Sequence, residues 1–382
     1  MILMEKRLYI DMHIIQTVPP SCVNRDDTGS PKTAVYGGVR RARVSSQSWK
    51  RAMRDCFNRS FDESELSIRT KKIVELVAEE IIKKDKSINS DDAKKKANEI
   101  ISTAGIKTKV SKTDDTLEAQ ALFFISRKQA ENLAILALSN KKIDKKDAQN
   151  ALNKGHGIDL ALFGRMVADD PSLNADASAQ IAHSISTHKV ENEYDYFTAV
   201  DERSPEDNSG AGMIGTIEFN SSTLYRYATV AVHDLKKQLD DPEITAKVIS
   251  EFAKVFTISM PTGKQNTFAN RTLPTAMLIS VRTDQPLNLV AAFESPISAD
   301  TMAGYGIRSA ERLAEYEKEV CCTFTSAPVK TWQIGKGLEL IGNAVDLQTA
   351  LDELRQYVKD CLAASNSEDS NVDKLNEHLQ ES

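Results

Sequence analysis

The stretch GGVRRARVSSQSWKRAMR, residues 37–54, carries six basic residues and no acidic one, in a chain whose net charge is −6. From Ser45 onward apolar residues recur at helical spacing, so that Trp49, Met53 and Phe57 share one face. We therefore predict a helix that begins near Ser45, with the Ser45 or Ser46 hydroxyl as its cap. The N-terminus of a helix carries partial positive charge, so this segment is suited to bind phosphate.

The side chains that would face a polyanion here are cations or small neutral donors. They are Arg40, Arg41, Ser45, Ser46, Gln47, Lys50, Arg51 and Arg54. Gly37 and Gly38 would let the backbone approach a ligand closely. Two interpretations stay open: a site for a polyphosphate backbone, whose affinity would fall steeply with salt, and a solvated basic helix face with a serine cap.

The bulk composition is that of a globular protein without special chemistry. The chain has 382 residues, of which 41% are hydrophobic and 27% charged. It has no apolar run long enough to cross a membrane and no signal-peptide pattern, so we expect it in the cytoplasm. Its five cysteines lack zinc-site spacing, and we interpret them as reduced thiols. We expect no metal and no cofactor.

Hydrophobic periodicity predicts an α+β chain. We expect a strand at 7–15, a loop at 16–38, a helical insertion over about 64–155 in which Phe123–Ile125 are helical, and a further helix at 177–188. A strand from 194, a mobile loop at 202–212 and a hairpin that turns at Asn220–Ser222 follow. Next come a helix that starts at Asp241–Pro242, a strand at 275–282 and helices near 309–320 and 347–363. This order is compatible with a ferredoxin-like sheet interrupted by an insertion.

Six segments in this order resemble one known family. They are SCVNRDDTGSPKTAVYGGVRRARVSSQSWKRAMR (21–54), GIDLALFGRM (157–166), AQIAHSISTH (179–188), YFTAVDE (196–202), GTIEFNSSTLYRYA (215–228) and PTGKQNTFA (261–269). The chain thereby resembles the CasC-type backbone subunits, members of the RAMP superfamily, of the type I-E CRISPR Cascade complex. The resemblance covers roughly residues 5–280.

The resemblance implies a hand-shaped fold and a set of partners. An RRM/ferredoxin-like palm would comprise residues 1–60 and 189–365, a helical fingers domain 61–188 and a thumb hairpin 198–215, while 366–382 would be a disordered tail. The subunit would bind CRISPR RNA without cutting it, stack with copies of itself in a helical filament, kink the RNA periodically and present its bases to a target DNA strand. Other Cascade subunits would be further partners in antiviral defence, and no membrane is implied.

The same resemblance assigns roles to individual residues. RNA phosphates and riboses would be held by Arg25, Arg40, Ser45, Ser46, Gln47, Lys50 and Arg51, with Lys264 and Gln265 within reach of phosphate. Met166 would be an apolar wedge beside a kinked base, or else a core methionine. The thumb would include Thr198, Val200, Asp201 and Gly215. Lys141, Lys142, Lys145 and Lys146 would contact DNA, or else form a solvated lysine face.

Two other classes of protein stay open. Asp26 and Asp27 lie beside the basic stretch and could serve a metal-dependent endoribonuclease, with His188 and Asp201 imagined nearby as acid or base. Against this, His183 and His188 would lie five residues apart on the expected helix, a poor spacing for one metal. We expect Asp26 and Asp27 instead to orient their loop by pairing with Arg25 or Arg40. A scaffold that assembles through protein contacts alone is the third class.

Overall fold

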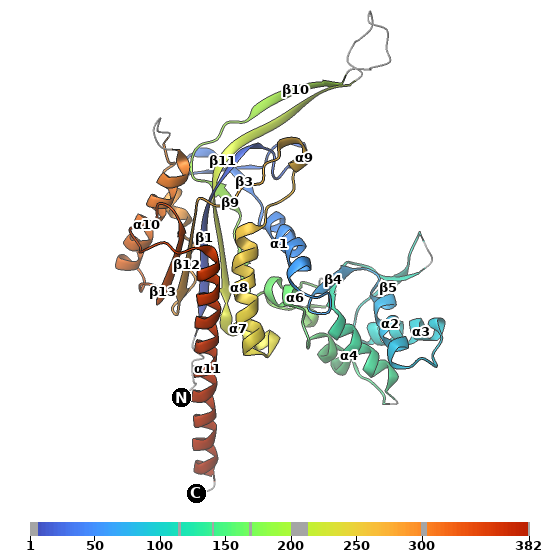
Figure 1. Cartoon of the computed structure of the whole chain (residues 1–382). Helices are drawn as coiled ribbons and strands as arrows, with labels where there is room; N and C mark the ends of the chain where they lie inside the picture. Colours follow the sequence, from blue (N-terminus) through green and yellow to red (C-terminus); the bar gives the residue numbers. More distant parts are fainter. Residues whose placement is uncertain are drawn as a thin grey trace, which may run out of the picture.

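The structure is a computed structural model that describes residues 7–113, 116–139, 141–167, 170–199, 213–298 and 304–380. It consists of a large sheet with helices on both faces, a separate helical lobe and a long two-stranded arm (Figure 1). The α+β class expected from the sequence is confirmed. Within the described ranges, no helix is both long and apolar enough to cross a membrane.

The sheet has nine strands, all paired antiparallel, in the order β13-β12-β1-β11-β9-β3-β2, with β8 and β10 paired to β11. The strands are β1 (Tyr9–Ser21), β2 (Thr33–Tyr36), β3 (Val39–Val44), β8 (Ala179–Ile181), β9 (Ser184–Ser186), β10 (Glu193–Ala199), β11 (Met213–Ala231), β12 (Ala276–Arg282) and β13 (Lys330–Gly335). The segment 16–38, which we predicted to be a loop, therefore contains the end of β1 and all of β2.

Strand β1 shows why both faces of the sheet are covered. Its residues alternate, and Ile10, Met12 and Ile14 pack on one face while Asp11 and His13, also buried, belong to the other. The first face is covered by α1 (Ser46–Ser60), α7 (Val232–Leu239), α8 (Pro242–Ile258) and α11 (Leu347–Gln380). The second face is covered by the 3₁₀ helix η3 (Leu289–Phe293) and by α10 (Tyr305–Thr323).

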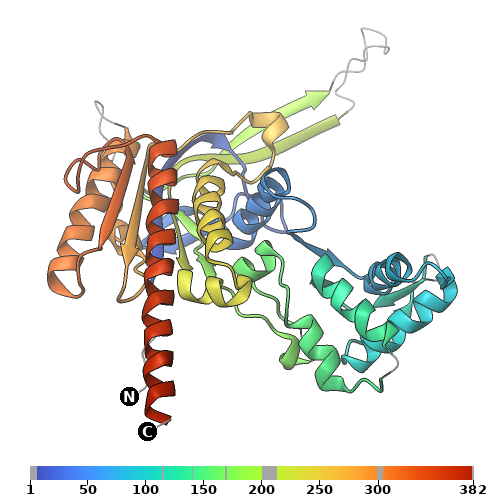
Figure 2. The ribbon, with the colours of Figure 1, turned by 60° about the horizontal axis from the view of Figure 1, so that its bottom comes forward.

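The helical lobe leaves the sheet after α1 and has its own core. It contains α2 (Ile73–Lys84), α3 (Ser90–Thr103), α4 (Arg127–Leu138), α5 (Lys145–Leu152) and the 3₁₀ helix η1 (Pro171–Leu173). Helix α6 (Ile158–Phe163), which lies between α5 and η1 in the chain, packs into the core of the sheet instead. Two short strand pairs join the helices of the lobe: β4 (Ser67–Thr70) with β7 (Phe123–Ser126), and β5 (Thr108–Val110) with β6 (Leu117–Ala119). Our expectation that Phe123–Ile125 are helical is therefore wrong. Figure 2 shows the lobe standing to one side of the sheet.

A buried carboxylate joins the lobe to the sheet. Asp159 of α6 accepts a hydrogen bond from the Ser67 amide at 2.8 Å and one from Arg54 Nε of α1 at 3.0 Å. Its side chain is only 3% exposed, so the ion pair is shielded from water on the carboxylate side. One contact thus connects α1, the first strand of the lobe and the helix that leads back to the sheet.

The arm is formed by β10 and the first part of β11, and it projects away from the sheet (Figure 1). The expected turn at Asn220–Ser222 is wrong, because β11 runs through it as one strand of 19 residues. In the arm Thr198 lies opposite Ile214, and Gly215 lies opposite Phe197. A Cβ atom at Gly215 would come within 2.4 Å of the Phe197 ring, so glycine makes room for that ring. Val200 and Asp201 lie outside the described residues.

Of the remaining predictions about local structure, some are wrong and some are confirmed. The helix expected at 177–188 is wrong: this segment contains β8 and β9, which pair with β11 and so belong to the sheet, although we had placed them in the fingers. Residues 366–380, for which we expected a disordered tail, continue α11. Two predicted helix starts are confirmed. Ser45 caps α1, and Asp241 caps α8, in which Pro242 is the first helical residue. All five cysteines are described and none forms a disulfide.

Candidate nucleic-acid interface

Helix α1 directs the basic residues outward. Ser45 caps the helix by accepting a hydrogen bond from the Ser48 amide, and its own amide donates to Asn24 Oδ1 at 2.9 Å. Trp49, Met53 and Phe57 are buried on the inner face. Because a helix that buries one stripe exposes the other, Lys50 and Arg51 are turned toward the surface.

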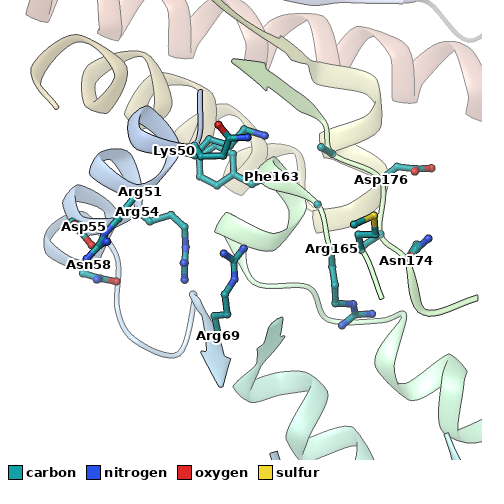
Figure 3. A pocket seen from close by; sticks show the side chains of 15 residues that line it. Lys50, Arg51, Arg54, Asp55, Asn58, Arg69, Phe163, Arg165, Asn174 and Asp176 are labelled. Atoms are coloured by element: carbon teal, nitrogen blue, oxygen red, sulfur yellow. The ribbon is translucent and has the colours of Figure 1, made fainter. Parts of the chain in front are cut away.

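A groove of about 850 Å³ separates α1 from the connection between lobe and sheet (Figure 3). Helix α1 contributes three cations to it, while the far side carries two arginines together with polar and apolar side chains. The lining consists of Gln47, Lys50, Arg51, Arg54, Asp55, Asn58, Arg69, Phe163, Gly164, Arg165, Met166, Asn174, Ala175, Asp176 and Ala177. Five of these residues are cationic and two are acidic, so the groove favours an anion.

The cations of the groove differ in how strongly they are engaged. The Lys50 ammonium lies 5.5 Å from the centre of the Phe163 ring, and partial burial lowers the pKa of Lys50. Arg54 pairs with Asp159, and its guanidinium lies 4.6 Å from the centre of the Phe124 ring. Arg165 is buried and donates to three backbone carbonyls, which makes it part of the wall. Arg51 is exposed and lies between this groove and a second pocket.

The second pocket, of about 560 Å³, lies on the other side of Arg51. It is lined by the loop Val23–Gly29, by α1 and by Pro261–Gly263. Gly263 lies against the Val23 backbone so closely that a Cβ would be 2.1 Å from its carbonyl oxygen, so only glycine lets the two loops meet. Lys264 and Gln265 follow directly, at the start of the short helix α9 (Gln265–Phe268).

Asp26 organises the loop that forms this pocket. Its carboxylate accepts hydrogen bonds from the Thr28 amide, the Thr28 hydroxyl and the Ser30 amide, and these bonds lower the pKa of Asp26. Asp26 therefore orients its loop, as we expected. Its partners are Thr28 and Ser30, however, and not Arg25 or Arg40 as we predicted. Asp27 and Arg25 are exposed and line the pocket.

Met166 projects from the far side of the groove with 86% of its surface exposed. This excludes the interpretation of Met166 as a core methionine. An exposed apolar side chain at the rim of a basic groove could contact the apolar face of a base, and the neighbouring cations could contact phosphate.

Arg41 was predicted to bind RNA, and the structure shows that this prediction is wrong. The side chain is completely buried and donates to the carbonyl oxygens of Tyr36, Ser186, Phe293 and Glu294, so it has no surface to offer a phosphate. Gly37 has the matching role, because a Cβ there would lie 1.7 Å from the Glu294 carbonyl oxygen. Close approach at Gly37 is therefore to the protein itself. Arg40, the next residue along β3, is exposed.

The four lysines of the lobe lie apart from the groove. Lys141 and Lys142 precede α5, and Lys145 and Lys146 open it; all four are exposed. Lys145 Nζ forms an ion pair with Asp170 at 2.7 Å, so it is less available than the other three.

The histidines that we considered as acid or base are structural in their contacts. The His188 ring stacks on Tyr305 at 3.8 Å, and its Nε2 accepts a hydrogen bond from the Thr223 amide at 3.0 Å. His183 lies beyond the end of β8, and its ring nitrogen is 3.3 Å from Arg43. In the part of the chain that is described, no three His, Cys, Asp or Glu side chains gather in a way that could hold a metal.

Several lining residues were not predicted from the sequence, among them Asn58, Arg69, Phe163, Asn174 and Asp176. Arg69 illustrates the reason. It lies on β4 of the lobe, with its guanidinium 5.1 Å from the centre of the Phe124 ring, and reaches the groove only because the lobe folds against α1. No local pattern marks it.

Comparison with known proteins identifies the family. The sheet, the arm and the groove define an α+β protein with an open, mainly cationic groove beside helix α1. The chain belongs to the family described as CT1975-like protein, whose model matches residues 10–359. None of the curated proteins compared with the chain matches it.

Solved structures give the same assignment. A chain of a CRISPR RNA-guided surveillance complex, pre-nicking, is 30% identical, with a TM-score of 0.78, and the match covers 92% of this chain and 100% of that one. A chain of a second CRISPR RNA-guided surveillance complex is 25% identical, with a TM-score of 0.67, and the match covers 90% and 99% of the two chains. Both matches therefore extend over nearly the whole fold.

Proposed function

We propose that this protein is the CRISPR RNA-binding backbone subunit of a type I-E Cascade surveillance complex, of the CasC type. The observation that carries the proposal is Arg51, which lies between two open pockets along one basic helix. The phosphate backbone of an RNA that runs along α1 can contact both pockets in succession. The similarity to chains of RNA-guided surveillance complexes supports RNA as the polyanion.

Binding would depend on the phosphates and leave the bases unread. Lys50, Arg51 and Arg40 would neutralise phosphates, while Ser46 and Gln47 at the start of α1 would donate to phosphate or ribose. Such contacts are independent of sequence and release counterions, so affinity falls as salt rises. Sequence recognition is then delegated to base pairing between the guide and its target.

The arm and the sheet would make a repeating assembly. In this proposal the sheet body is the RRM-like palm, the helical lobe the fingers and the β10–β11 arm the thumb of the hand. The arm of one copy would reach the RNA held by the next, and Met166 would displace a base where the RNA kinks. Repetition along one RNA would supply avidity that a single subunit lacks.

We further propose that the subunit does not cut RNA. Asp26, one of the two carboxylates of the second pocket that we considered for metal-dependent cleavage, is engaged in holding its own loop. An RNase assay with Mg²⁺ or Mn²⁺ on the purified protein is expected to show no cleavage. Cleavage that disappears in Asp26→Ala or Asp27→Ala would contradict this part of the proposal.

The proposal is tested by co-purification with guide RNA. The chain is expressed with its neighbouring Cascade proteins and a CRISPR RNA, once unchanged and once with Lys50→Glu and Arg51→Glu. We expect the unchanged protein to elute with RNA protected in periodic segments, and the double variant to lose it, because repulsion replaces two phosphate contacts.

A control of equal charge change separates the groove from overall charge. The elements α10 and β13 lie away from α1 (Figure 1). Lys318 on α10 and Lys336 directly after β13 are exposed. Lys318→Glu with Lys336→Glu should leave RNA co-elution intact. The assignment of this groove is contradicted if RNA elutes equally with both double variants, or if both double variants lose it.

A further inference from the structure

Arg226 is a buried cation in the middle of β11. Its guanidinium carbon lies 3.8 Å from the centre of the Trp49 ring and 4.6 Å from that of Phe256. One terminal nitrogen donates to Gln16 Oε1 at 2.6 Å and the other to the Phe256 carbonyl. Among the described residues no carboxylate pairs with it. Burial lowers the pKa of Arg226 to about 9, so it is still charged at neutral pH.

Packing does not explain a charge at this position. Removing a guanidinium from water is unfavourable, and apolar residues of similar volume often replace buried charged groups without loss of stability. An apolar chain cannot supply a flat cation between two rings together with donors in a fixed fork. Such a group restricts the orientation of the elements that it contacts.

The first element it restricts is α1. Trp49, which stacks on Arg226, directly precedes Lys50 and Arg51 in the groove. The indole Nε1 of Trp49 also donates to Ser184 Oγ of β9 at 2.9 Å, so the ring is held at its face and at its edge. The helical rotation that turns Lys50 and Arg51 outward is thereby linked to β11.

The second element is the segment that forms the opposite wall of the second pocket. Gln16, the acceptor for Arg226, donates through Nε2 to the Thr272 carbonyl at 2.9 Å. Phe256 lies in the last turn of α8. Residues 259–272 include the pocket-lining Pro261–Gly263. This segment is held at both ends by Arg226: directly at Phe256, and through Gln16 at Thr272.

We propose that Arg226 is a positioning residue for RNA binding, which fixes the separation between Arg51 on α1 and the Gly263 loop so that both contact one phosphate backbone. This inference rests on the proposed function. Arg226 is itself buried and touches no phosphate. Its loss should therefore weaken binding by the folded protein without removing a contact that releases a counterion.

The experiment compares Arg226→Met with Arg51→Met in the full chain, both of which remove one positive charge. Circular dichroism checks the fold, and the affinity for a single-stranded RNA of about a dozen nucleotides is measured over a range of salt concentrations. We expect R226M to bind about tenfold more weakly with an unchanged salt slope. We expect R51M to reduce the slope by about 0.7.

A fluorescence signal reports the position of Trp49 directly. The chain has two tryptophans, so Trp332→Phe leaves Trp49 as the only one. In that background R226M should change the Trp49 emission, because the stacked cation is gone, whereas R51M should not. This readout shows whether a variant alters the surroundings of Trp49, which the loss of a surface phosphate contact alone should leave unchanged.

The outcomes are distinct. Unchanged affinity in folded R226M would overturn the proposal, because Arg226 would then serve stability alone. A slope reduced as much as in R51M would also overturn it, because Arg226 would then act on the phosphates as a charge. If R51M changes neither affinity nor slope, the proposed function fails at this groove and the inference fails with it.

A second variant serves if R226M does not fold. The Thr272 hydroxyl accepts from Gln16 Nε2 at 3.3 Å and donates to the Thr17 carbonyl at 2.8 Å. Thr272→Val loosens this far end of the connection and leaves Arg226 in place. We expect binding about threefold weaker with an unchanged salt slope. Unchanged affinity in T272V would overturn the proposal.

Discussion

Two neighbouring arginines, Arg40 and Arg41, have opposite surroundings. Arg40 is exposed near the start of the basic stretch, whereas Arg41 is buried and binds backbone carbonyls from three segments of the sheet body. The sequence marks both as cations next to a helix. It does not show that the partners of Arg41, Ser186 and Phe293, come from distant parts of the chain. Residue type was therefore predictable here and burial was not.

The arginine pair gives a matched prediction. Arg41→Met should lower the free energy of unfolding by about 2–4 kcal/mol, because several buried carbonyls lose their donor. Arg40→Met should change it by less than about 0.5 kcal/mol and should instead weaken RNA binding. Urea unfolding and an RNA titration on both variants measure this. Equal stability of the two variants would contradict the roles assigned.

Asp11 is a second residue whose surroundings decide its behaviour. It accepts hydrogen bonds from the Tyr227 hydroxyl at 3.0 Å and the Leu287 amide at 2.8 Å. Burial raises the pKa of Asp11 to about 6, although these bonds and the charge of Arg282 oppose the rise. The folded state therefore holds its proton more tightly than the unfolded state does.

The sign of the resulting pH dependence follows from this rise. The stabilising contribution of Asp11 is complete below its unfolded pKa of about 3.8 and is lost as pH rises through about 6. Relative to Asp11→Asn, the unchanged protein should lose up to about 3 kcal/mol between these pH values. Burial lowers the pKa of His13 to about 3, which has the opposite pH dependence. The difference between the two proteins in urea unfolding isolates Asp11, and a difference that is constant with pH would contradict the prediction.

At the scale of elements, helix α1 was predicted from its sequence because its signals agree. A serine cap, an apolar stripe and outward cations all favour the same helix. Ser45 and Ser46 were both considered as caps and as RNA contacts. In the structure Ser45 is buried and caps the helix, while the Ser46 hydroxyl donates a hydrogen bond to Gln47 Oε1 at 3.5 Å and caps no amide of the described residues.

The two serines should therefore respond differently to substitution. Ser45→Ala is expected to lower the free energy of unfolding by about 1 kcal/mol, because the Ser48 amide loses its acceptor. Ser46→Ala should change it by less than about 0.5 kcal/mol. Thermal or urea unfolding distinguishes them. A larger loss in S46A than in S45A would mean that the helix starts one residue later.

The segment 179–188 shows where local pattern fails. Ile181 and Ile185 are four residues apart, which is a helical spacing, yet they lie on two short strands. Ser184 and Ser186 explain the difference. Both are buried, and their hydroxyls bond to Trp49 Nε1 and to the Ala42 amide. Contacts with distant strands override a helical preference that the segment would otherwise have.

The polar run at Asn220–Ser222 was misinterpreted as a turn for a related reason. In the structure Asn220 and Ser222 are buried, and Asn220 Nδ2 donates to Asn192 Oδ1 at 3.1 Å. β1 has a bulge between Val18 and Ser21 at the same place. These polar residues lie where the sheet gives way to the arm, which is a position that sequence composition alone assigns to a loop.

At the scale of the whole molecule, the groove exists because two separate units meet. One wall comes from α1 and the other from the return of the lobe, and the Arg54–Asp159 pair holds them together. The sequence predicted the basic wall and Met166. It did not predict Arg69 or Asn174, because their place depends on how the lobe is seated.

The lysines of the lobe give a prediction for the assembled complex. Lys145 is ion-paired, so Lys141→Ala, Lys142→Ala and Lys146→Ala are combined without it. We expect the affinity of the RNA-loaded complex for duplex DNA to fall roughly tenfold at physiological salt, with guide RNA binding unchanged. Filter binding or fluorescence anisotropy measures both.

A matched triple variant on the same lobe is the control. Lys94→Ala, Lys95→Ala and Lys96→Ala on α3 remove the same charge from another helix. This variant should retain duplex affinity. A similar loss in both triple variants would show that only the total charge of the lobe matters, and the assignment of the α5 lysines to DNA would fail.

The undivided strand β11 has a mechanical consequence. Its 19 residues extend over about 60 Å, and no hinge separates the part inside the sheet from the part in the arm. The length of this strand therefore fixes how far the arm extends from the sheet. Two residues inserted beyond Phe219 would lengthen it by about 7 Å and keep each side chain on its face, whereas one inserted residue would reverse every face beyond it. In a stack of copies, the repeat length along the RNA would then be set by the length of a single strand.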